Sequence, residues 1–92
     1  MPAFSSAEIA QALQAIPDWR LDNGALARSF SFSDFREAMS FVNSVAAVAE
    51  KAGHHPDIDI RYNKVNLTLS SHDAGGITER DFSLATEIGN VL

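Results

Sequence analysis

The sequence contains no cysteine, which excludes disulfide bonds, thiolate metal ligands and a cysteine nucleophile. It also has few basic residues, with 7 Lys and Arg against 12 Asp and Glu and a formal net charge of −5. Because the basic residues form no cluster, direct binding to nucleic acid or to an anionic membrane is not expected. No apolar run approaches the roughly 20 residues of a membrane-spanning helix. We therefore expect a cytoplasmic protein.

The residues that are present suffice for one small hydrophobic core. The chain has 92 residues, of which 46% are hydrophobic. This length leaves no room for a second domain of ordinary size, so we expect a single domain over residues 1–92. A core this small gives limited stability, and self-association is therefore expected as well.

Capping signals and turn residues predict a helix and a hairpin in the first third of the chain. Ser5 and Glu8 fit a capping box that opens a helix over about 6–16, and Pro17 ends it. A short strand is predicted to begin at Trp19. The turn signal at 22–24, Asp-Asn-Gly, tolerates the positive φ angles of a tight turn.

The next strand and the longest helix follow from the apolar pattern. Alternating apolar residues predict a half-buried strand from Leu26 to Phe32. A helix is predicted over about 34–52, with a second capping box of Asp34 and Glu37 and with Gly53 as the residue that ends it. Its apolar stripe comprises Phe35, Ala38, Met39, Val42, Val45, Ala46 and Ala49. A second seam, formed by Phe41 and Val48, widens this face, which favours deep burial and leaves a helix-to-helix subunit contact as the second interpretation.

Alternating apolar and polar residues over 57–70 predict a second hairpin. Pairing Tyr62 with Val65 across the turn residues 63–64 puts every apolar partner on one face, whereas a shift of one residue would mix the faces. In this register His55 lies opposite His72 at the open end of the hairpin. Pro56 interrupts the ladder there, so we expect proximity rather than a regular pair.

The C-terminal part is predicted to hold a flexible loop at 73–76 and a third helix that Thr78 and Asp81 cap. The apolar stripe of this helix comprises Ile77, Leu84, Ala85, Ile88 and Leu92. Asp81 falls on the same stripe although it is charged, and the favourable helix dipole at the N-terminal turn accounts for it. The element order α-β-β-α-β-β-α predicts an α+β fold, a four-stranded antiparallel sheet with three helices packed on one face.

The three histidines, His54, His55 and His72, are the candidate catalytic residues. Imidazoles titrate close to neutral pH, so a cluster of them can supply a proton donor and a proton acceptor together. A metal site ranks lower, because neighbouring side chains on an extended backbone point in opposite directions. The plainest alternative is that the histidines only form a turn and a strand end. Tyr62 and Trp19 are more often core aromatics than substrate contacts.

The spacing of seven residues resembles the signature of the pterin-4a-carbinolamine dehydratase family. Three residues separate a glutamate from the His-His-Pro triplet, and five more separate the triplet from a tyrosine. Nine residues then lie between the tyrosine and the third histidine, and eight lie between that histidine and an aspartate. The seven residues are Glu50, His54, His55, Pro56, Tyr62, His72 and Asp81. The flanking segments 62–65, 67–70 and 76–81 agree as well, and weaker similarity extends over nearly the whole chain.

The resemblance implies a 4a-hydroxytetrahydrobiopterin dehydratase, a hydro-lyase that removes the 4a-hydroxyl as water and yields quinonoid dihydropterin in tetrahydrobiopterin recycling. It implies a pterin substrate, a homodimer or homotetramer, and neither a metal nor an organic cofactor. A non-catalytic assembly or dimerisation protein of the same fold is the alternative. Relatives of that kind tend to lack the histidine signature, which this chain keeps.

By the same resemblance, His54 and His72 carry the acid–base work and His55 positions the substrate, with a share in proton transfer. Supporting roles are implied for Glu50, Trp19, Ser71 and Asp81. Glu50 would orient an imidazole, Trp19 would wall the pterin ring, and Asp81 would hold the loop that carries His72. Ser71 stands where the family commonly has threonine, so the hydroxyl is kept.

Overall fold

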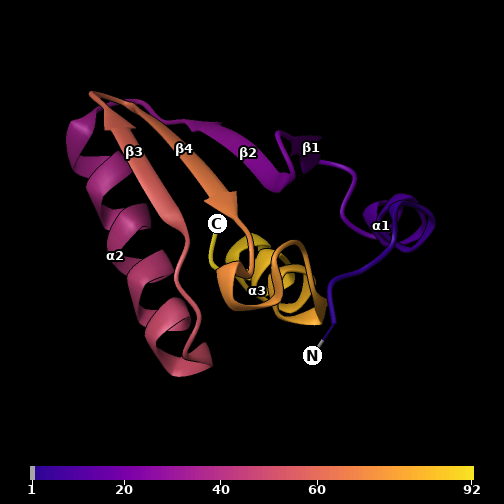
Figure 1. Ribbon diagram of the computed structural model, residues 1–92. Coiled ribbons are helices and arrows are strands. Elements are labelled where there is room, and N and C mark those ends of the chain that lie inside the picture. Colours follow the sequence, from indigo (N-terminus) through magenta and orange to yellow (C-terminus); the bar gives the residue numbers. More distant parts are fainter. Residues whose placement is uncertain (1) are drawn as a thin grey trace.

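The computed structural model describes residues 2–92 and contains one open antiparallel sheet with the strand order β1-β2-β4-β3 (Figure 1). The elements in chain order are α1 (Ser6–Leu13), β1 (Arg20–Asp22), β2 (Ala25–Ser31), α2 (Phe35–Ala52), β3 (Asp57–Arg61), β4 (Lys64–Leu69), the short 3-10 helix η1 (His72–Ala74) and α3 (Glu79–Asn90). The predicted fold class and element order are therefore confirmed. Within residues 2–92, no helix combines the length and the apolar character needed to cross a membrane.

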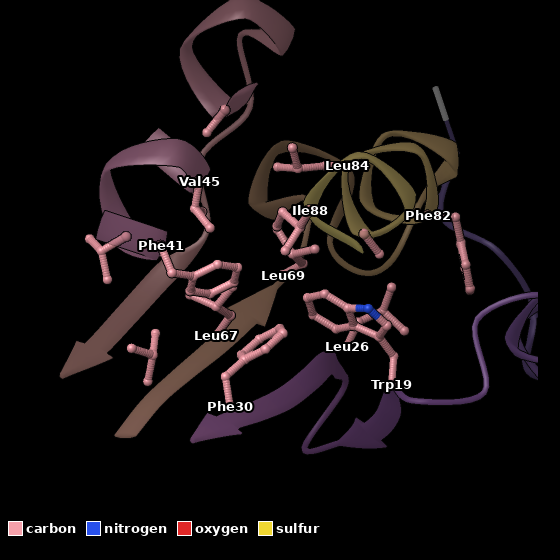
Figure 2. Packing of buried hydrophobic residues seen from close by; sticks show 14 of the residues in the cluster. Trp19, Leu26, Phe30, Phe41, Val45, Leu67, Leu69, Phe82, Leu84 and Ile88 are labelled. Carbon is pink, nitrogen blue, oxygen red and sulfur yellow. The ribbon is translucent and has the colours of Figure 1, made fainter. Parts of the chain in front are cut away.

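The hydrophobic core lies between one face of the sheet and the helices α2 and α3 (Figure 2). The central strands β2 and β4 supply most of the sheet side of this core, since they have a neighbour on each side. The largest fully buried apolar side chains are Leu26, Val45, Val65, Leu67, Leu69, Ile77, Leu84 and Ile88. Helix α1 lies apart, beyond β1 (Figure 1), and packs against this core through partly buried residues only.

The helix ends and the first turn follow the capping and turn residues with two differences. Asn23 and Gly24 both have positive φ, at 50° and 78°, as the predicted tight turn requires. Helix α1 ends at Leu13 rather than at residue 16, because 3-10 type hydrogen bonds tighten its last turn. The Asp34 capping box is only half formed, since Glu37 turns its carboxylate to the backbone N–H and hydroxyl of Ser33 instead.

The wide apolar face of α2 is used inside the molecule. Phe41 is 5% exposed and its ring lies 4.6 Å from that of Phe30 and 5.1 Å from that of Phe32. Most of the predicted stripe is buried or half-buried, but Phe35 and Ala46 are exposed. Deep burial, the first interpretation of the wide face, is therefore confirmed for Phe41.

The predicted register of the second hairpin is wrong by two residues. Ile60 pairs with Val65, and the turn residues are Tyr62 and Asn63. Asn63 is fixed by two hydrogen bonds to the end of β2, where its side chain donates to the Phe32 carbonyl and its own carbonyl accepts from the Phe32 N–H. A shift of two residues keeps each side chain on its face, so the apolar pattern could not detect the error.

Two apolar predictions at the periphery are also wrong. Tyr62 is not a core aromatic, because its turn position leaves it 65% exposed with a φ of 55°. Leu92 lies beyond the end of α3 and is 62% exposed, while Phe82, which was not predicted, is buried and stacks on Phe4. The edge position of β3 explains why its inward-facing isoleucines remain partly exposed.

Candidate active site

The end of helix α2 determines where His54 lies. Gly53 adopts the left-handed conformation with φ 65°, and its N–H bonds to the Glu50 carbonyl. The N–H of His54 bonds to the Ala49 carbonyl, which completes a Schellman motif. His54 and His55 therefore lie in a fixed turn outside the regular strand, since β3 begins only at Asp57.

A fully buried carboxylate receives the His54 ring. Asp81 is 0% exposed, and its Oδ1 lies 2.6 Å from His54 Nε2. Its Oδ2 accepts hydrogen bonds of 2.9 Å from the Ser71 hydroxyl and from the Thr78 N–H. The His54 side chain is only 12% exposed, so this pair is largely removed from water.

The segment that carries His72 forms a short 3-10 helix, where a loop was predicted at 73–76. A bridge between Ser71 and Gly76 closes it, and η1 forms inside the closure. Arg80 donates a 2.6 Å hydrogen bond to Asp73 across the same segment. This hydrogen bond lowers the pKa of Asp73 and raises that of Arg80.

A second imidazole–carboxylate pair lies at the surface. His55 Nε2 is 2.5 Å from Glu50 Oε1, and the two side chains are 61% and 78% exposed. Glu50 lies in the last turn of α2, one helical turn before the histidine pair. The expected contact between Glu50 and an imidazole is therefore present.

The register that put His55 opposite His72 is wrong, and the two residues form no regular ladder pair, as the interruption at Pro56 led us to expect. The ladder between β3 and β4 begins with Asp57 and Thr68, and His72 lies beyond it in η1. No hydrogen bond within residues 2–92 joins His72 to another histidine, and His72 is exposed. The link between the His72 segment and the buried pair is Ser71, the preceding residue, which donates to the same Asp81 carboxylate that His54 contacts.

Trp19 lies in the core rather than beside the histidines. It is 5% exposed, meets Phe30 edge to face and lines a hollow with Arg28, Ala85 and Thr86. No contact observed in residues 2–92 connects its ring to the three histidines. Most of the ring surface is therefore covered by protein in this conformation.

The described part of the chain, residues 2–92, contains no cluster of side chains that could bind a metal ion. Residues 2–92 hold no group of three or more His, Asp or Glu side chains close enough to share an ion. Each of His54 and His55 meets a single carboxylate instead. Such pairs suit the orientation of an imidazole for proton transfer.

Two features of the site were missed in the sequence. The pairing of His54 with Asp81 was not predicted, although a charged residue on the apolar stripe of a helix was its signal. The side chain of Thr78 was predicted only as a cap, but its hydroxyl also lies 2.9 Å from that of Ser71. The predicted capping of α3 by Thr78 and Asp81 is itself confirmed.

The chain is similar to known proteins of one family. The sequence matches the model of the family described as pterin 4 alpha carbinolamine dehydratase over residues 2–91. Two relatives, named provisionally as pterin-4-alpha-carbinolamine dehydratases, are each 54% identical to this chain. The relative from Chloroflexus aurantiacus aligns over 100% of this chain and 99% of its own length, and that from Thermomicrobium roseum over 99% and 98%.

Two solved structures share the fold. A protein described as a transcriptional coactivator/pterin dehydratase from Brucella melitensis superposes with a TM-score of 0.92 at 35% identity, over 97% of both chains. A pterin dehydratase-like protein described as a RuBisCO assembly factor in the alpha-carboxysome superposes with a TM-score of 0.68 at 26% identity, over 80% of this chain and 88% of its own. From the match over nearly the whole sequence, the chain belongs to the pterin-4a-carbinolamine dehydratase family.

Proposed function

We propose that this protein dehydrates 4a-hydroxytetrahydropterins, with 4a-hydroxytetrahydrobiopterin as the representative substrate. The observation that carries the proposal is the imidazole of His54 held by a fully buried carboxylate, in a chain of this family. The products are water and a quinonoid dihydropterin, so the enzyme would act in the recycling of tetrahydropterin.

The reaction needs two proton transfers and no change of oxidation state through a cofactor. The bond between C4a and the hydroxyl oxygen breaks, the leaving hydroxyl takes a proton from an acid, and a base takes a proton from a ring nitrogen. An imidazolium can donate and a neutral imidazole can accept near neutral pH, each contribution being worth roughly 10²- to 10⁴-fold in rate. We assign these transfers to His54 and His72, and substrate positioning with a share in proton transfer to His55.

The supporting residues have roles that fit their contacts. Asp81 orients His54, and Glu50 orients His55. Ser71 connects Asp81 to the segment that carries His72. A wall for the pterin ring was expected from Trp19, and its burial gives that role no supporting contact.

The test is a turnover assay with the purified protein and chemically prepared 4a-hydroxytetrahydropterin, followed by ultraviolet absorbance. We expect acceleration over buffer, and we expect His54→Ala and His72→Ala to lose most of it while circular dichroism shows a retained fold. A matched control is His55→Ala, for which a larger effect on KM than on kcat is expected. No acceleration by the wild-type protein would exclude the proposed activity.

A non-catalytic assembly role is the second candidate, and the likeness to the RuBisCO assembly factor favours it. The observation against it is that His54 and His55 each keep a carboxylate partner in this chain. Isolation of a stable complex from extract, together with absence of pterin turnover, would reverse the order of the two candidates.

We further propose that residues 1–92 act as one domain that forms a cytoplasmic homodimer or homotetramer. The partly exposed apolar residues on β3 and Phe35 on α2 support self-association, since such side chains gain stability when covered. Sedimentation of the wild-type protein at several concentrations would test this, and a monomer at all of them would exclude it.

A further inference from the structure

All the buried polar side chains of residues 2–92 belong to one cluster. Ser71, Thr78 and Asp81 are 1%, 0% and 0% exposed, and every other buried residue is apolar. Burial of polar groups is costly unless each is hydrogen-bonded, so a single cluster of them at the His54 ring calls for an explanation beyond core packing.

The hydrogen bonds in the cluster can run in only one direction. The Thr78 N–H can only donate to Asp81 Oδ2, and the Ser71 hydroxyl donates its single hydrogen to the same oxygen. The Thr78 hydroxyl must therefore donate to Ser71 across 2.9 Å, and it accepts the N–H of Arg80 at 3.2 Å. Every hydrogen is then assigned, and Oδ2 acts only as an acceptor.

The contact of His54 is with the other oxygen of Asp81. The remaining oxygen, Asp81 Oδ1, faces His54 Nε2 at 2.6 Å, a short hydrogen bond. With Asp81 as a carboxylate, Oδ1 can only accept, so the shared hydrogen lies on His54 Nε2. The neutral ring is therefore protonated at Nε2 and carries its lone pair on Nδ1.

The second nitrogen of His54, Nδ1, has no hydrogen-bond partner among residues 2–92. In residues 2–92, only Arg80 Nε is a buried side-chain nitrogen or oxygen without a hydrogen-bond partner. His54 Nδ1 has no partner either, so it is not fully buried and keeps access to solvent. A neutral His54 can thus accept a proton at Nδ1 while Asp81 holds the other side of the ring.

We propose that Thr78 and Ser71 are positioning residues, a hydroxyl relay that holds Asp81 so that His54 keeps one tautomer and accepts a proton through Nδ1. The inference rests on the proposed dehydratase function and assigns the base within it. His54 takes the proton from the pterin ring nitrogen, and the proton that leaves with the hydroxyl comes from a different group. The relay itself gains and loses no proton in the step.

The first measurement is the tautomer of His54 in the full-length wild-type protein. Long-range ¹H–¹⁵N spectra of histidine-labelled protein, recorded where the imidazole is neutral, separate the two tautomers, and His54→Gln assigns the signals. We expect hydrogen on Nε2. Hydrogen on Nδ1 would overturn the proposal, and this result needs neither a substrate nor a relay variant.

The second measurement uses Ser71→Ala, which removes the middle of the relay, and Ser71→Thr, which restores the hydroxyl. We expect Ser71→Ala to mix the His54 tautomers and to lower kcat about tenfold with little change in KM, and we expect Ser71→Thr to restore both. The matched control is Ser83→Ala, which removes a hydroxyl that donates to the exposed carboxylate of Glu79. Unchanged tautomer and kcat in Ser71→Ala would overturn the relay.

The two readouts keep this proposal separate from the proposed function. If the wild-type protein shows no turnover but His54 has the expected tautomer and loses it in Ser71→Ala, the positioning role is supported and the dehydratase activity is excluded. Should turnover be present while the tautomer is the other one, the activity stands and the relay falls.

Discussion

Two neighbouring histidines bind carboxylates at almost the same distance in opposite surroundings. His54 lies 2.6 Å from Asp81 with side chains 12% and 0% exposed, and His55 lies 2.5 Å from Glu50 with side chains 61% and 78% exposed. The N–O distance therefore does not distinguish the two pairs, but their exposure to solvent does. Exposed charges interact weakly and are screened by salt. A buried carboxylate has lost its hydration, so it depends on hydrogen bonds from its protein partners for stabilisation.

A contact between an imidazole and a carboxylate therefore has a structural role in the buried pair that it lacks in the exposed pair. The buried pair is part of the core and of the site at once, since Asp81 also caps α3 and binds Ser71. The Glu50 side chain contacts His55 alone, and we expect changes in this exposed pair to have little effect on the fold. Mutations of the two carboxylates should separate stability from chemistry.

The largest effect is expected for Asp81→Ala. The substitution leaves the Ser71 hydroxyl, the Thr78 N–H and the His54 ring without their acceptor in a buried place. We expect a loss of about 3–5 kcal/mol in the free energy of unfolding. Urea denaturation measures it, with Glu87→Ala, an exposed carboxylate on the same helix, as the control. A loss below about 1 kcal/mol would remove the energetic distinction between the pairs.

A smaller quantity, the coupling energy within each pair, tests the comparison more directly. We expect a double-mutant cycle of His54→Ala and Asp81→Ala to give a coupling of about 1–3 kcal/mol. The matched cycle of His55→Ala and Glu50→Ala should give less than about 1 kcal/mol, because that pair is exposed. Equal coupling energies in the two cycles would mean that burial does not decide the strength of the contact.

Local signals in the sequence were enough for the fold. Capping residues, Gly53 and the apolar periods each act within a few residues, so the elements and their order could be predicted. The register of the second hairpin could not, because shifts by two residues keep the same faces. Asn63 decided it through bonds to the end of β2, a contact over a long sequence separation.

The site was predictable in its residues but not in its pairing. A charged residue on an apolar stripe, Asp81, indicated an unusual position, and the helix dipole was a sufficient local reason for it. The partner, His54, lies 27 positions earlier in the chain, and only the packing of α3 against the end of α2 brings the two together. Tyr62 illustrates the reverse case, where an aromatic residue that suggests the core lies in a turn.

A small effect on stability is expected for Glu50→Gln. Exposed ion pairs contribute little, so the free energy of unfolding should change by less than about 0.5 kcal/mol. Because Gln removes the negative charge next to His55, turnover should change more than stability does. Urea denaturation and the turnover assay on the same sample measure both. A stability loss as large as that of Asp81→Ala would show that the exposed pair also supports the fold.

The smallest effect is expected at acid pH from the exposed pair of Asp73 and Arg80. The hydrogen bond from Arg80 lowers the pKa of Asp73 below the ordinary value of about 3.9 in the folded protein. The unfolded chain therefore binds the proton first as pH falls, so the contribution of Asp73 is complete above the unfolded value and is lost as pH falls through the folded one.

Asp73→Asn removes this titration, so thermal melts between about pH 5 and about pH 2 should show a shallower loss of stability than in the wild type. The matched variant Arg80→Gln removes the donor and should flatten the profile in the same way. Asp59 on the sheet face also has a lowered pKa, mainly because of a hydrogen bond from Asn66 and secondly because of one from Arg61. Its titration is present in the wild type and in both variants, so it does not contribute to the difference between their profiles. Parallel stability–pH profiles for the wild type and Asp73→Asn would mean that the hydrogen bond between Arg80 and Asp73 does not contribute to folding. The hydrogen bond between Ser71 and Asp81 would then be the contact that holds the His72 segment.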